Sequence, residues 1–445
     1  MTTLFGTDGV RGPANQLLTP ELAVALARAA AGRTVPEGGR VIIGRDTRVS
    51  GPMLEAALAS GFASAGADVC LAGIIPTPAI SFLIKDEHAD LGAVISASHN
   101  PPEDNGIKFF NRRGMKLDVE EEAAIEAAID RETSTGTRIG TIAPLEAAAT
   151  RYAAFLTGVI DIEHVDFSGM TIVVDCAYGA TAKIAPHVFH HLGARVVALH
   201  DALDGNRINQ DCGSTCLDPL RRAVSEHEAD LGIAFDGDGD RVLLVGSDGG
   251  IINGDHMIGI AALHMSDAAS LSPPLVVTTV MSNLGLETRL ADTGIDVIRT
   301  PVGDRHVSQT MDETAALLGG EPSGHIIFSE YSPTGDGILT AVKLLEIAHR
   351  QGADLGTLAR LIPLYPQVLR NVPCAAPAEL VEDERVRGAV TQARARLGSR
   401  GQVLIRPSGT QPLIRILVEA SDEAECESIA DMIEAAFHGA RTESN

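Results

Sequence analysis

Short apolar runs alternate with amphipathic stretches along most of the chain, and the same succession of elements occurs three times. Each copy has an apolar strand, a loop, a helical stretch and a second strand that opens with Gly-Ala or Gly-Ile. Strands and helices that alternate at this spacing predict βαβ units in mixed or mostly parallel sheets. The expected first strands are 41–44, 172–175 and 275–278, the helices lie near 51–65, 180–192 and 283–292, and the second strands begin at 66, 193 and 294.

A third strand in each copy leads into a loop rich in polar side chains. The segments 89–92, 229–232 and 317–320 precede the loops that hold Ser98, Asp236 and Glu321, in that order. Ligands of open α/β sheets bind outside the carboxyl ends of the strands. We therefore expect the three domains to face one shared cleft.

The pattern changes after the third copy. Pro363, Pro366 and Pro373 predict a linker, and the elements expected beyond it are a helix near 380–397, strands at 402–405 and 413–419, and a closing helix near 422–437. We predict an α/β protein of three similar βαβ-type domains, whose mixed sheets are sandwiched by helices, with a C-terminal α+β domain around a central cleft. The predicted domains are residues 1–152, 153–253, 254–365 and 366–445.

The charge and hydrophobicity of the chain argue against some classes of binding partner. The 445 residues are 45% hydrophobic and 21% charged, and the formal net charge is −24. This charge argues against nucleic acid or an anionic membrane as a partner, and no apolar run approaches the length of a membrane span. The first residues lack a basic leader, and the six cysteines are scattered, so we expect a cytoplasmic protein with reduced thiols.

Three aspartates alternate with glycines directly after an apolar strand, as Asp236-Gly237-Asp238-Gly239-Asp240. The glycines allow a tight turn in which the carboxylates converge, and without a cation these groups would repel one another. Oxygen-only ligands favour Mg²⁺ or Ca²⁺. An EF-hand does not fit, because Arg241 and Ser247 stand where that motif needs glycine and glutamate. The alternative is an acidic surface turn.

Ser98 lies where another apolar strand passes abruptly into Ser98-His99-Asn100-Pro101. A hydroxyl presented in this way is a nucleophile if a neighbouring group activates it, and the alternative is a serine that caps a turn. The loops 5–12 and 44–51 each place arginine near glycine, which suits either a phosphate contact or a brace for the cleft. Cys212, Cys216 and the histidines at 187, 190 and 191 lack the spacing of a common zinc site.

The segment Arg406-Pro407-Ser408-Gly409-Thr410, with Arg415 nearby, contains the parts of a phosphate cradle. Guanidinium groups bind phosphate through two hydrogen bonds, and hydroxyls and a glycine N–H approach it closely. A plain turn is the alternative. No Walker motif and no G-x-S-x-G segment occur, which disfavours a P-loop NTPase and an α/β-hydrolase.

Together these motifs resemble the α-D-phosphohexomutase superfamily over the whole chain, and within it the bacterial branch that acts on glucosamine phosphates, the phosphoglucosamine mutases. Residues 96–101 are similar to the phosphoserine loop and residues 236–241 to the magnesium loop. Residues 321–325 resemble the sugar-specificity loop and 406–410 the phosphate loop. The resemblance implies that the four domains carry, in chain order, the phosphoserine, the metal, the sugar site and the phosphate site.

The resemblance further implies an intramolecular phosphotransfer. Phosphorylated Ser98 would pass its phosphoryl group to O1 of glucosamine 6-phosphate, and the 1,6-bisphosphate would return its 6-phosphoryl group, leaving glucosamine 1-phosphate on the route to UDP-N-acetylglucosamine and cell wall. Mg²⁺ and glucosamine 1,6-bisphosphate, or glucose 1,6-bisphosphate, are the implied cofactors; a sugar phosphate is the implied partner, and a homodimer the suggested assembly. The implied residues are Ser98, His99, Lys108, Arg11 and His325 for catalysis; Ser98, Asp236, Asp238 and Asp240 for the metal; and Arg241, Glu321, Ser323, Arg406, Ser408, Gly409, Thr410 and Arg415 for the substrate.

Three other functions would use part of the same residues. A phosphoglucomutase or phosphomannomutase would share the mechanism and differ in the sugar. A serine phosphatase would also pair a serine with a carboxylate-bound metal, but such sites usually need histidine ligands, and the aspartate loop has none. A non-catalytic sugar-phosphate sensor would have no need of a phosphoryl acceptor such as Ser98.

Overall fold

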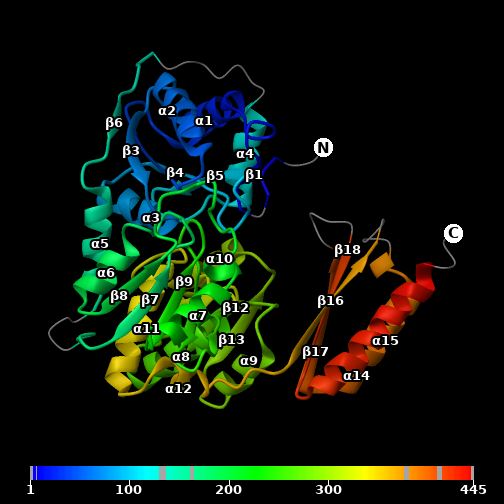
Figure 1. Cartoon of the computed structure of the whole chain (residues 1–445). Coiled ribbons are helices and arrows are strands. Elements are labelled where there is room, and N and C mark those ends of the chain that lie inside the picture. Colours follow the sequence, from blue (N-terminus) through cyan, green and yellow to red (C-terminus); the bar gives the residue numbers. More distant parts are fainter. Residues whose placement is uncertain are drawn as a thin grey trace. The chain divides into compact units, whose positions relative to one another are not determined.

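The computed structural model describes residues 4–6, 8–129, 137–160, 165–374, 380–407 and 413–441. The chain divides into two compact units, Met1–Met281 with Thr293–Leu361, and Ser282–Asp292 with Ile362–Asn445. Three sheets belong to the first unit and a fourth to the second (Figure 1). In the part of the chain that the structure describes, no helix has the length and apolar character needed to cross a membrane.

The first sheet has six strands in the order β1-β5-β4-β2-β3-β6. Strand β2 runs parallel to β3 and β4, whereas β5 is antiparallel to both β4 and β1. Its elements are β1 (Val10–Pro13), α1 (Pro20–Thr34), β2 (Arg40–Arg45), α2 (Gly51–Ser64), β3 (Asp68–Ile74), α3 (Thr77–Asp86), β4 (Leu91–Ile95), β5 (Asp104–Asn111), α4 (Val119–Ile129) and β6 (Ile142–Pro144), with α5 (Ala148–Gly158) after them.

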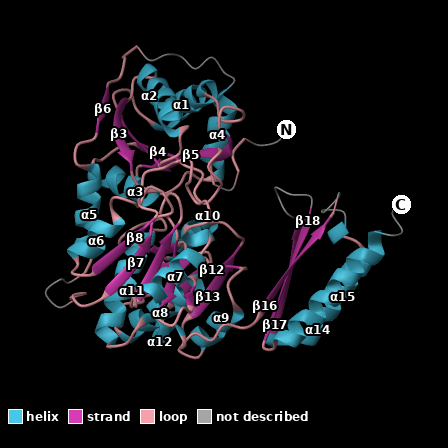
Figure 2. Cartoon of the chain, in the orientation of Figure 1, coloured by secondary structure: helices cyan, strands magenta, loops and turns pink. Residues whose placement is uncertain are grey.

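Helices cover both faces of this sheet (Figure 2). Leu91 and Ala93 of β4 share one core with the buried residues of α1 and α2. Gly92, between them, faces α3, because a Cβ atom there would lie only 2.4 Å from Ile84 Cδ1. Successive side chains of a strand point to opposite faces. Strand β4 is therefore buried on both sides, which is why it reads as a continuous apolar run rather than an alternating one.

The second sheet has five strands in the order β11-β10-β9-β7-β8. Strand β7 runs parallel to β8 on one side and to β9 on the other, so its carboxyl end lies at the point where the strand order reverses. Its elements are β7 (Thr171–Asp175), α6 (Ala185–His191), β8 (Arg195–Leu199), the 3₁₀ turn η1 (Gly213–Thr215), α7 (Asp218–Glu226), β9 (Leu231–Phe235), β10 (Val242–Gly246) and β11 (Ile251–Ile252).

The helix predicted near 180–192 is shorter than expected and begins at Ala185. Ala177 and Tyr178 have φ angles of 51° and 53°, in the left-handed region, so the chain leaves β7 in a tight turn. At Gly179 a Cβ atom would lie 2.3 Å from the carbonyl oxygen of Gly237. Close packing against the aspartate loop thus replaces the first helical turns.

The third sheet has four strands in the order β13-β12-β14-β15. Strand β12 is parallel to β13 and β14, and β15 is antiparallel to β14. Its elements in the first unit are α8 (Gly254–Asp267), β12 (Leu275–Thr279), β13 (Asp296–Thr300), α10 (Asp304–Thr314), β14 (Leu318–Gly320), β15 (Ile326–Phe328), α11 (Gly337–Gln351) and α12 (Leu355–Ala359).

The second unit contains an antiparallel sheet in the order β16-β18-β17. Its elements are α9 (Leu284–Ala291), β16 (Gln367–Pro373), α14 (Glu384–Leu397), the 3₁₀ turn η2 (Gly398–Arg400), β17 (Gly401–Pro407), β18 (Leu413–Ala420) and α15 (Glu423–Arg441). The prediction of a linker is wrong for residues 367–373, which form β16. This strand lies at the edge of the sheet, where a proline such as Pro373 is tolerated. The predicted fold class is confirmed, while the four domain boundaries stay predictions.

Candidate active site

Ser98 follows the carboxyl end of β4, and only 1% of its surface is exposed. Its backbone φ is 52°, in the left-handed region that serine rarely adopts. The N–H of Ser98 donates to Ser96 Oγ at 2.9 Å, and Ser96 Oγ donates to Asp46 Oδ2 at 2.6 Å. These bonds hold the turn that presents the Ser98 hydroxyl.

Two residues from other loops hold the backbone of this turn. The fully buried guanidinium of Arg48 donates to the carbonyl oxygens of Ser98 and Asn100 at 3.0 and 2.8 Å. Asn209 Nδ2, from the second repeat, donates to the same two oxygens at 2.8 and 3.1 Å. The loop of Ser98 is therefore fixed from both repeats at once.

The aspartate loop follows β9, and Asp236, Asp238 and Asp240 are all buried. The hydroxyl of Ser98 donates to Asp236 Oδ2 at 2.5 Å, joining residues that are 138 positions apart in the sequence. One oxygen from each of the three carboxylates lies within 4.8 Å of the other two. The structure thus brings the serine loop and the aspartate loop together, in the arrangement that the internal repeat predicts.

This loop fits a hard divalent cation. The Oδ1 atoms of Asp238 and Asp240 are buried and have no hydrogen-bond partner among the described residues. Burial, followed by the charges of Asp240 and Asp238, raises the pKa of Asp236 well above its usual range. Carboxylates this close repel one another unless a cation lies between them. A donor set made only of oxygen matches Mg²⁺.

Lys108, on β5, neutralises part of this negative charge. Its Nζ lies 2.9 Å from Asp238 Oδ2 and 3.2 Å from Asp8 Oδ2. Burial opposes the ammonium charge, but Asp238 and Asp8 outweigh burial and raise the pKa of Lys108 above its usual range. Arg11, on β1, pairs with Asp8 and donates to the carbonyl of Ala97 at 3.3 Å. The carboxylates around Lys108 thus keep it charged at neutral pH, so it cannot act as a proton acceptor.

His99 lies beside the reactive hydroxyl. Its Nδ1 is 3.3 Å from Ser98 Oγ. Burial, followed by the positive charges of Arg241 and Arg11, lowers the pKa of His99 to about 4. The imidazole is consequently neutral near pH 7, and a neutral imidazole can accept a proton.

The loop after β14, residues 321–325, lies beside the aspartate loop. His325 Nδ1 lies 3.6 Å from Asp240 Oδ2, and Arg241 Nε lies 3.9 Å from Asp240 Oδ1. Ser323 Oγ donates to Glu321 Oε2 at 3.5 Å, and Glu321 is only 7% exposed. Side chains from all three repeats therefore meet around the aspartates.

Sequence analysis missed Lys116 and Asp304. Lys116 forms ion pairs with Asp8 and Asp304, and Asp304 Oδ2 lies 3.7 Å from His325 Nε2. Asp304 stands in the first turn of α10, where an acidic residue is usual on any helix. Neither residue belongs to a motif, so no sequence signal distinguishes them from surface charges.

The phosphate loop is described only at its edges. Arg406 on β17 and Arg415 on β18 are paired in register across the two strands. Burial and the neighbouring Arg415 lower the pKa of Arg406, as expected where two cations share a site. Such a pair suits an anionic ligand. Ser408, Gly409 and Thr410 lie outside the described residues.

Family models match four consecutive segments of the chain. They are described as phosphoglucomutase/phosphomannomutase alpha/beta/alpha domain I at residues 2–136, domain II at 150–249, domain III at 253–365, and C-terminal domain at 369–436. The four segments follow the order of the sheets and leave few residues unmatched.

Curated relatives are similar over almost the full length. The phosphoglucosamine mutase of Syntrophomonas wolfei is 45% identical over 438 residues, covering 96% of this chain and 97% of its own. That of Corynebacterium efficiens is 46% identical over 444 residues, covering 98% and 99%.

Solved structures share the fold. A phosphoglucomutase/phosphomannomutase family protein from Burkholderia thailandensis has a TM-score of 0.83 at 26% identity, covering 99% of this chain and 98% of its own. The N-acetylphosphoglucosamine mutase of Aspergillus fumigatus, solved with GlcNAc-6P and magnesium, has a TM-score of 0.70 at 15% identity, covering 98% and 96%. At that identity the likeness concerns the fold alone.

Proposed function

This chain belongs to the phosphohexomutase superfamily, and we propose that it is a phosphoglucosamine mutase, an isomerase that interconverts glucosamine 6-phosphate and glucosamine 1-phosphate. One observation carries the proposal: the buried Ser98 hydroxyl donates to Asp236, within a group of three carboxylates suited to a divalent cation. The names of the full-length relatives support glucosamine as the sugar.

The reaction uses Ser98 as a phosphoryl carrier. The O1 hydroxyl of glucosamine 6-phosphate attacks the phosphorus of phosphorylated Ser98 in line; the new O1–P bond forms as the P–Oγ bond breaks. The O1 proton leaves to a base, and the electron pair left on Oγ takes up a proton. The resulting glucosamine 1,6-bisphosphate reorients in the site and returns its 6-phosphoryl group to Oγ by the reverse steps. Glucosamine 1-phosphate is released, and Ser98 is phosphorylated again.

Two groups of the site, His99 beside Ser98 and Lys108 beside Asp238, have the protonation states that these transfers need. Neutral His99, 3.3 Å from Oγ, accepts a proton, and Lys108, held charged by Asp238 and Asp8, donates one. Asp236, Asp238 and Asp240, with an oxygen of the phosphorylated Ser98, would hold Mg²⁺. When bound, this ion supplies positive charge that offsets the charge of the transferring phosphoryl group.

The remaining predicted residues bind the substrate or support catalysis in this proposal. Glu321 and Ser323 contact sugar hydroxyls, and Arg241 and His325 balance charge beside Asp240. The phosphate that is not being transferred is held by Arg406, Ser408, Gly409, Thr410 and Arg415. Since the substrates are phosphorylated metabolites and the described cysteines are free thiols, we place the reaction in the cytoplasm.

A substrate comparison tests the proposal. Purified enzyme is supplied with Mg²⁺ and a trace of glucose 1,6-bisphosphate, and kcat/KM is measured for glucosamine, glucose and mannose 6-phosphates. We expect the highest value for glucosamine 6-phosphate and no turnover in Ser98→Ala with any of the three sugars. A higher value for glucose or mannose 6-phosphate would assign the chain to that sugar instead, and turnover by Ser98→Ala would refute the phosphoserine mechanism.

A further inference from the structure

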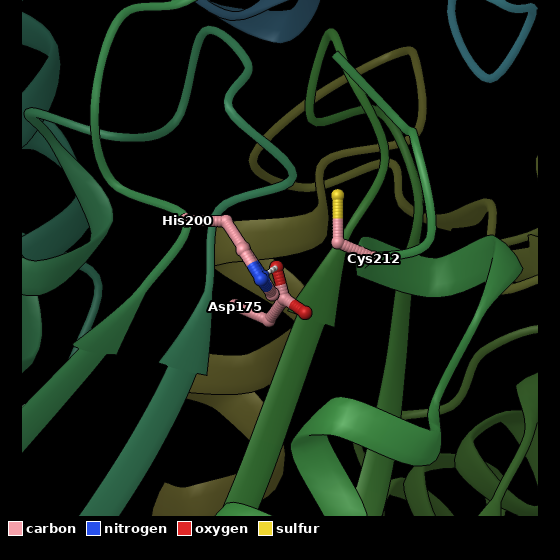
Figure 3. Close-up of side chains that lie close together, drawn as sticks. All are labelled: Asp175, His200 and Cys212. Carbon is pink, nitrogen blue, oxygen red and sulfur yellow. Dashed lines mark hydrogen bonds and ion pairs between the residues drawn. The ribbon is translucent and has the colours of Figure 1, made fainter. Parts of the chain in front are cut away.

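A second group of potential ligands lies at the carboxyl end of β7, the strand next to β9, which leads into the aspartate loop. Asp175 is the last residue of β7, His200 directly follows β8, and Cys212 directly precedes η1 (Figure 3). This is the point where the strand order of the second sheet reverses, the usual position of a ligand in such sheets. None of the three side chains has a part in the proposed phosphotransfer.

The three side chains lie close together, with Asp175 and His200 facing each other and the sulfur of Cys212 pointing away from both in Figure 3. One ligand atom of each, a carboxylate oxygen, an imidazole nitrogen and a thiol sulfur, lies within 4.8 Å of the other two. His200 Nδ1 is 3.0 Å from Asp175 Oδ1, the contact drawn as a dashed line in Figure 3. Asp175 and Cys212 have no exposed surface, and the His200 side chain is 22% exposed.

The carboxylate is held in place by the backbone. The N–H of Ala177 donates to Asp175 Oδ1 at 2.9 Å, and the N–H of Gly213 donates to Oδ2 at 3.0 Å. Oδ1 also contacts His200 Nδ1, so Oδ2, which keeps a second lone pair, is the oxygen able to bind a cation. The Cys212 thiol, although buried, makes no hydrogen bond to a described residue.

We propose that Asp175, His200 and Cys212 form a second cation site, selective for a soft divalent ion such as Zn²⁺. Mixed sulfur, nitrogen and oxygen donors are the ligands that Zn²⁺ prefers, whereas the oxygen-only aspartate loop suits Mg²⁺. The sulfur binds as a thiolate, so the thiol proton is released when the ion enters. A fourth ligand would be water, since the three residues supply three donor atoms. The inference does not depend on the proposed mutase activity.

An ion at this site would hold together the two ends of the loop 200–213, which contacts the backbone of Ser98. His200 and Gly213 stand at the two ends of this loop, and both are joined to Asp175. Between them, the N–H of Asn209 donates to the carbonyl of Ala177 at 3.0 Å, and its side chain holds the carbonyl of Ser98 at 2.8 Å. An ion on Asp175, His200 and Cys212 would thus fix the loop that positions the serine, without touching substrate.

Cobalt titration of the full-length protein tests the site. The protein is stripped with a chelator, excess Mg²⁺ is added to fill the aspartate loop, and Co²⁺ serves as a spectroscopic substitute for Zn²⁺. We expect one equivalent of Co²⁺ to produce a thiolate-to-cobalt charge-transfer band that one equivalent of Zn²⁺ removes. We expect Cys212→Ser to lose the band and His200→Gln to weaken Co²⁺ binding at least about tenfold.

Cys70→Ser is the matched control, because Cys70 is a partly exposed thiol on β3 of the first sheet, and it should keep the band. His200→Gln keeps the test decisive if Cys212→Ser does not fold, because the His200 side chain is partly exposed. No band in the wild-type protein, or a band that persists in Cys212→Ser or is unweakened in His200→Gln, would overturn the proposal. The cluster would then be a hydrogen-bonded loop anchor only.

Discussion

The guanidinium of Arg48 donates to the backbone carbonyl of Ser98 at 3.0 Å, although the two residues are 50 positions apart in the sequence. The same fully buried side chain donates to the carbonyls of Asn100 and Asp104, both at 2.8 Å, and pairs with Asp46 at 2.9 Å. Because Ser98 has a φ of 52°, these bonds stabilise a backbone that a serine adopts at a cost. The position of the reactive hydroxyl is thus set by a cation from another loop.

We therefore expect Arg48→Lys to lower kcat strongly while changing KM little. An ammonium group cannot reproduce the forked donors that reach several carbonyls at once. Removing the charge altogether in Arg48→Met should destabilise the protein by about 3 to 5 kcal/mol, because Asp46 is left buried without its partner. Steady-state kinetics and urea unfolding measure the two effects.

Arg45→Lys is the control for this pair. Arg45 belongs to the same segment, but its guanidinium pairs with Glu55 of α2 at 3.2 Å rather than with the serine loop. The Arg45 side chain is 17% exposed. The kcat of Arg45→Lys should stay near that of the wild type. A fully active Arg48→Lys enzyme would show that the serine loop keeps its shape without the guanidinium.

The crowding of the three aspartates predicts opposite effects of one substitution under two conditions. In the presence of a chelator, Asp236→Asn should raise the thermal midpoint, because without a cation Asp236 must either stay charged beside two other buried carboxylates or take up a proton on folding, and an amide avoids both costs. With Mg²⁺ present it should lower the midpoint relative to wild type and weaken Mg²⁺ binding at least about tenfold, because a ligand is lost. Calorimetric scans with and without Mg²⁺ measure both.

Asp248→Asn serves as the control, because Asp248 is an exposed carboxylate of the same sheet. Its two midpoints should match those of the wild type. If Asp236→Asn shifted the midpoint in the same direction with chelator and with Mg²⁺, the aspartates would not act as a cation site.

Asp336 should make stability depend on pH. This buried N-cap of α11 accepts from Tyr152 Oη at 2.7 Å and from the N–H of Leu339 at 3.0 Å, and burial raises its pKa to about 6 despite these bonds. Between pH of about 4 and 6 the unfolded chain ionises this group while the folded protein does not, so the free energy of unfolding falls by about 3 kcal/mol as the pH rises.

Asp336→Asn keeps the cap but cannot ionise, so its free energy of unfolding should fall less over that range in urea titrations. Asp354→Asn is the matched cap, on α12. Hydrogen bonds from Thr357 lower the pKa of Asp354, so its contribution is lost as the pH falls rather than as it rises. Parallel curves for wild type and Asp336→Asn would show that the pKa of Asp336 is the same in the folded and unfolded protein, which would contradict the prediction.

Patterning predicted the serine and aspartate loops because each follows a fully buried strand, and buried parallel strands read as apolar runs that end at the site. Their meeting, with Ser98 Oγ 2.5 Å from Asp236, follows from the repeat. Strand β16 was not predicted because its prolines are typical of a loop. In the structure, pairing with β18 along its whole length outweighs this local preference.

Residues that act through distant partners were beyond the reach of sequence patterning. Lys116 contacts Asp304, 188 positions away, and Asp175 joins both ends of the loop from His200 to Gly213. Each is an ordinary charged residue in its local segment, and only the packing of the repeats gives it a role. The residues that hold the backbone of Ser98 were missed for the same reason, since Arg48 and Asn209 come from outside its loop.

The central claim is that Ser98 carries the phosphoryl group, and peptide mapping by mass spectrometry tests it most directly. The full-length enzyme is incubated with Mg²⁺ and glucose 1,6-bisphosphate, digested, and each phosphorylated peptide is fragmented to assign its site. We expect one phosphoryl group, on Ser98; when it is introduced from 18O-labelled glucose 1,6-bisphosphate and the excess is removed, turnover of unlabelled glucosamine 6-phosphate should replace the heavy phosphoryl group on Ser98 by an unlabelled one. Phosphate found only on other residues, or a labelled phosphoryl group on Ser98 that turnover of glucosamine 6-phosphate fails to exchange, would contradict the account.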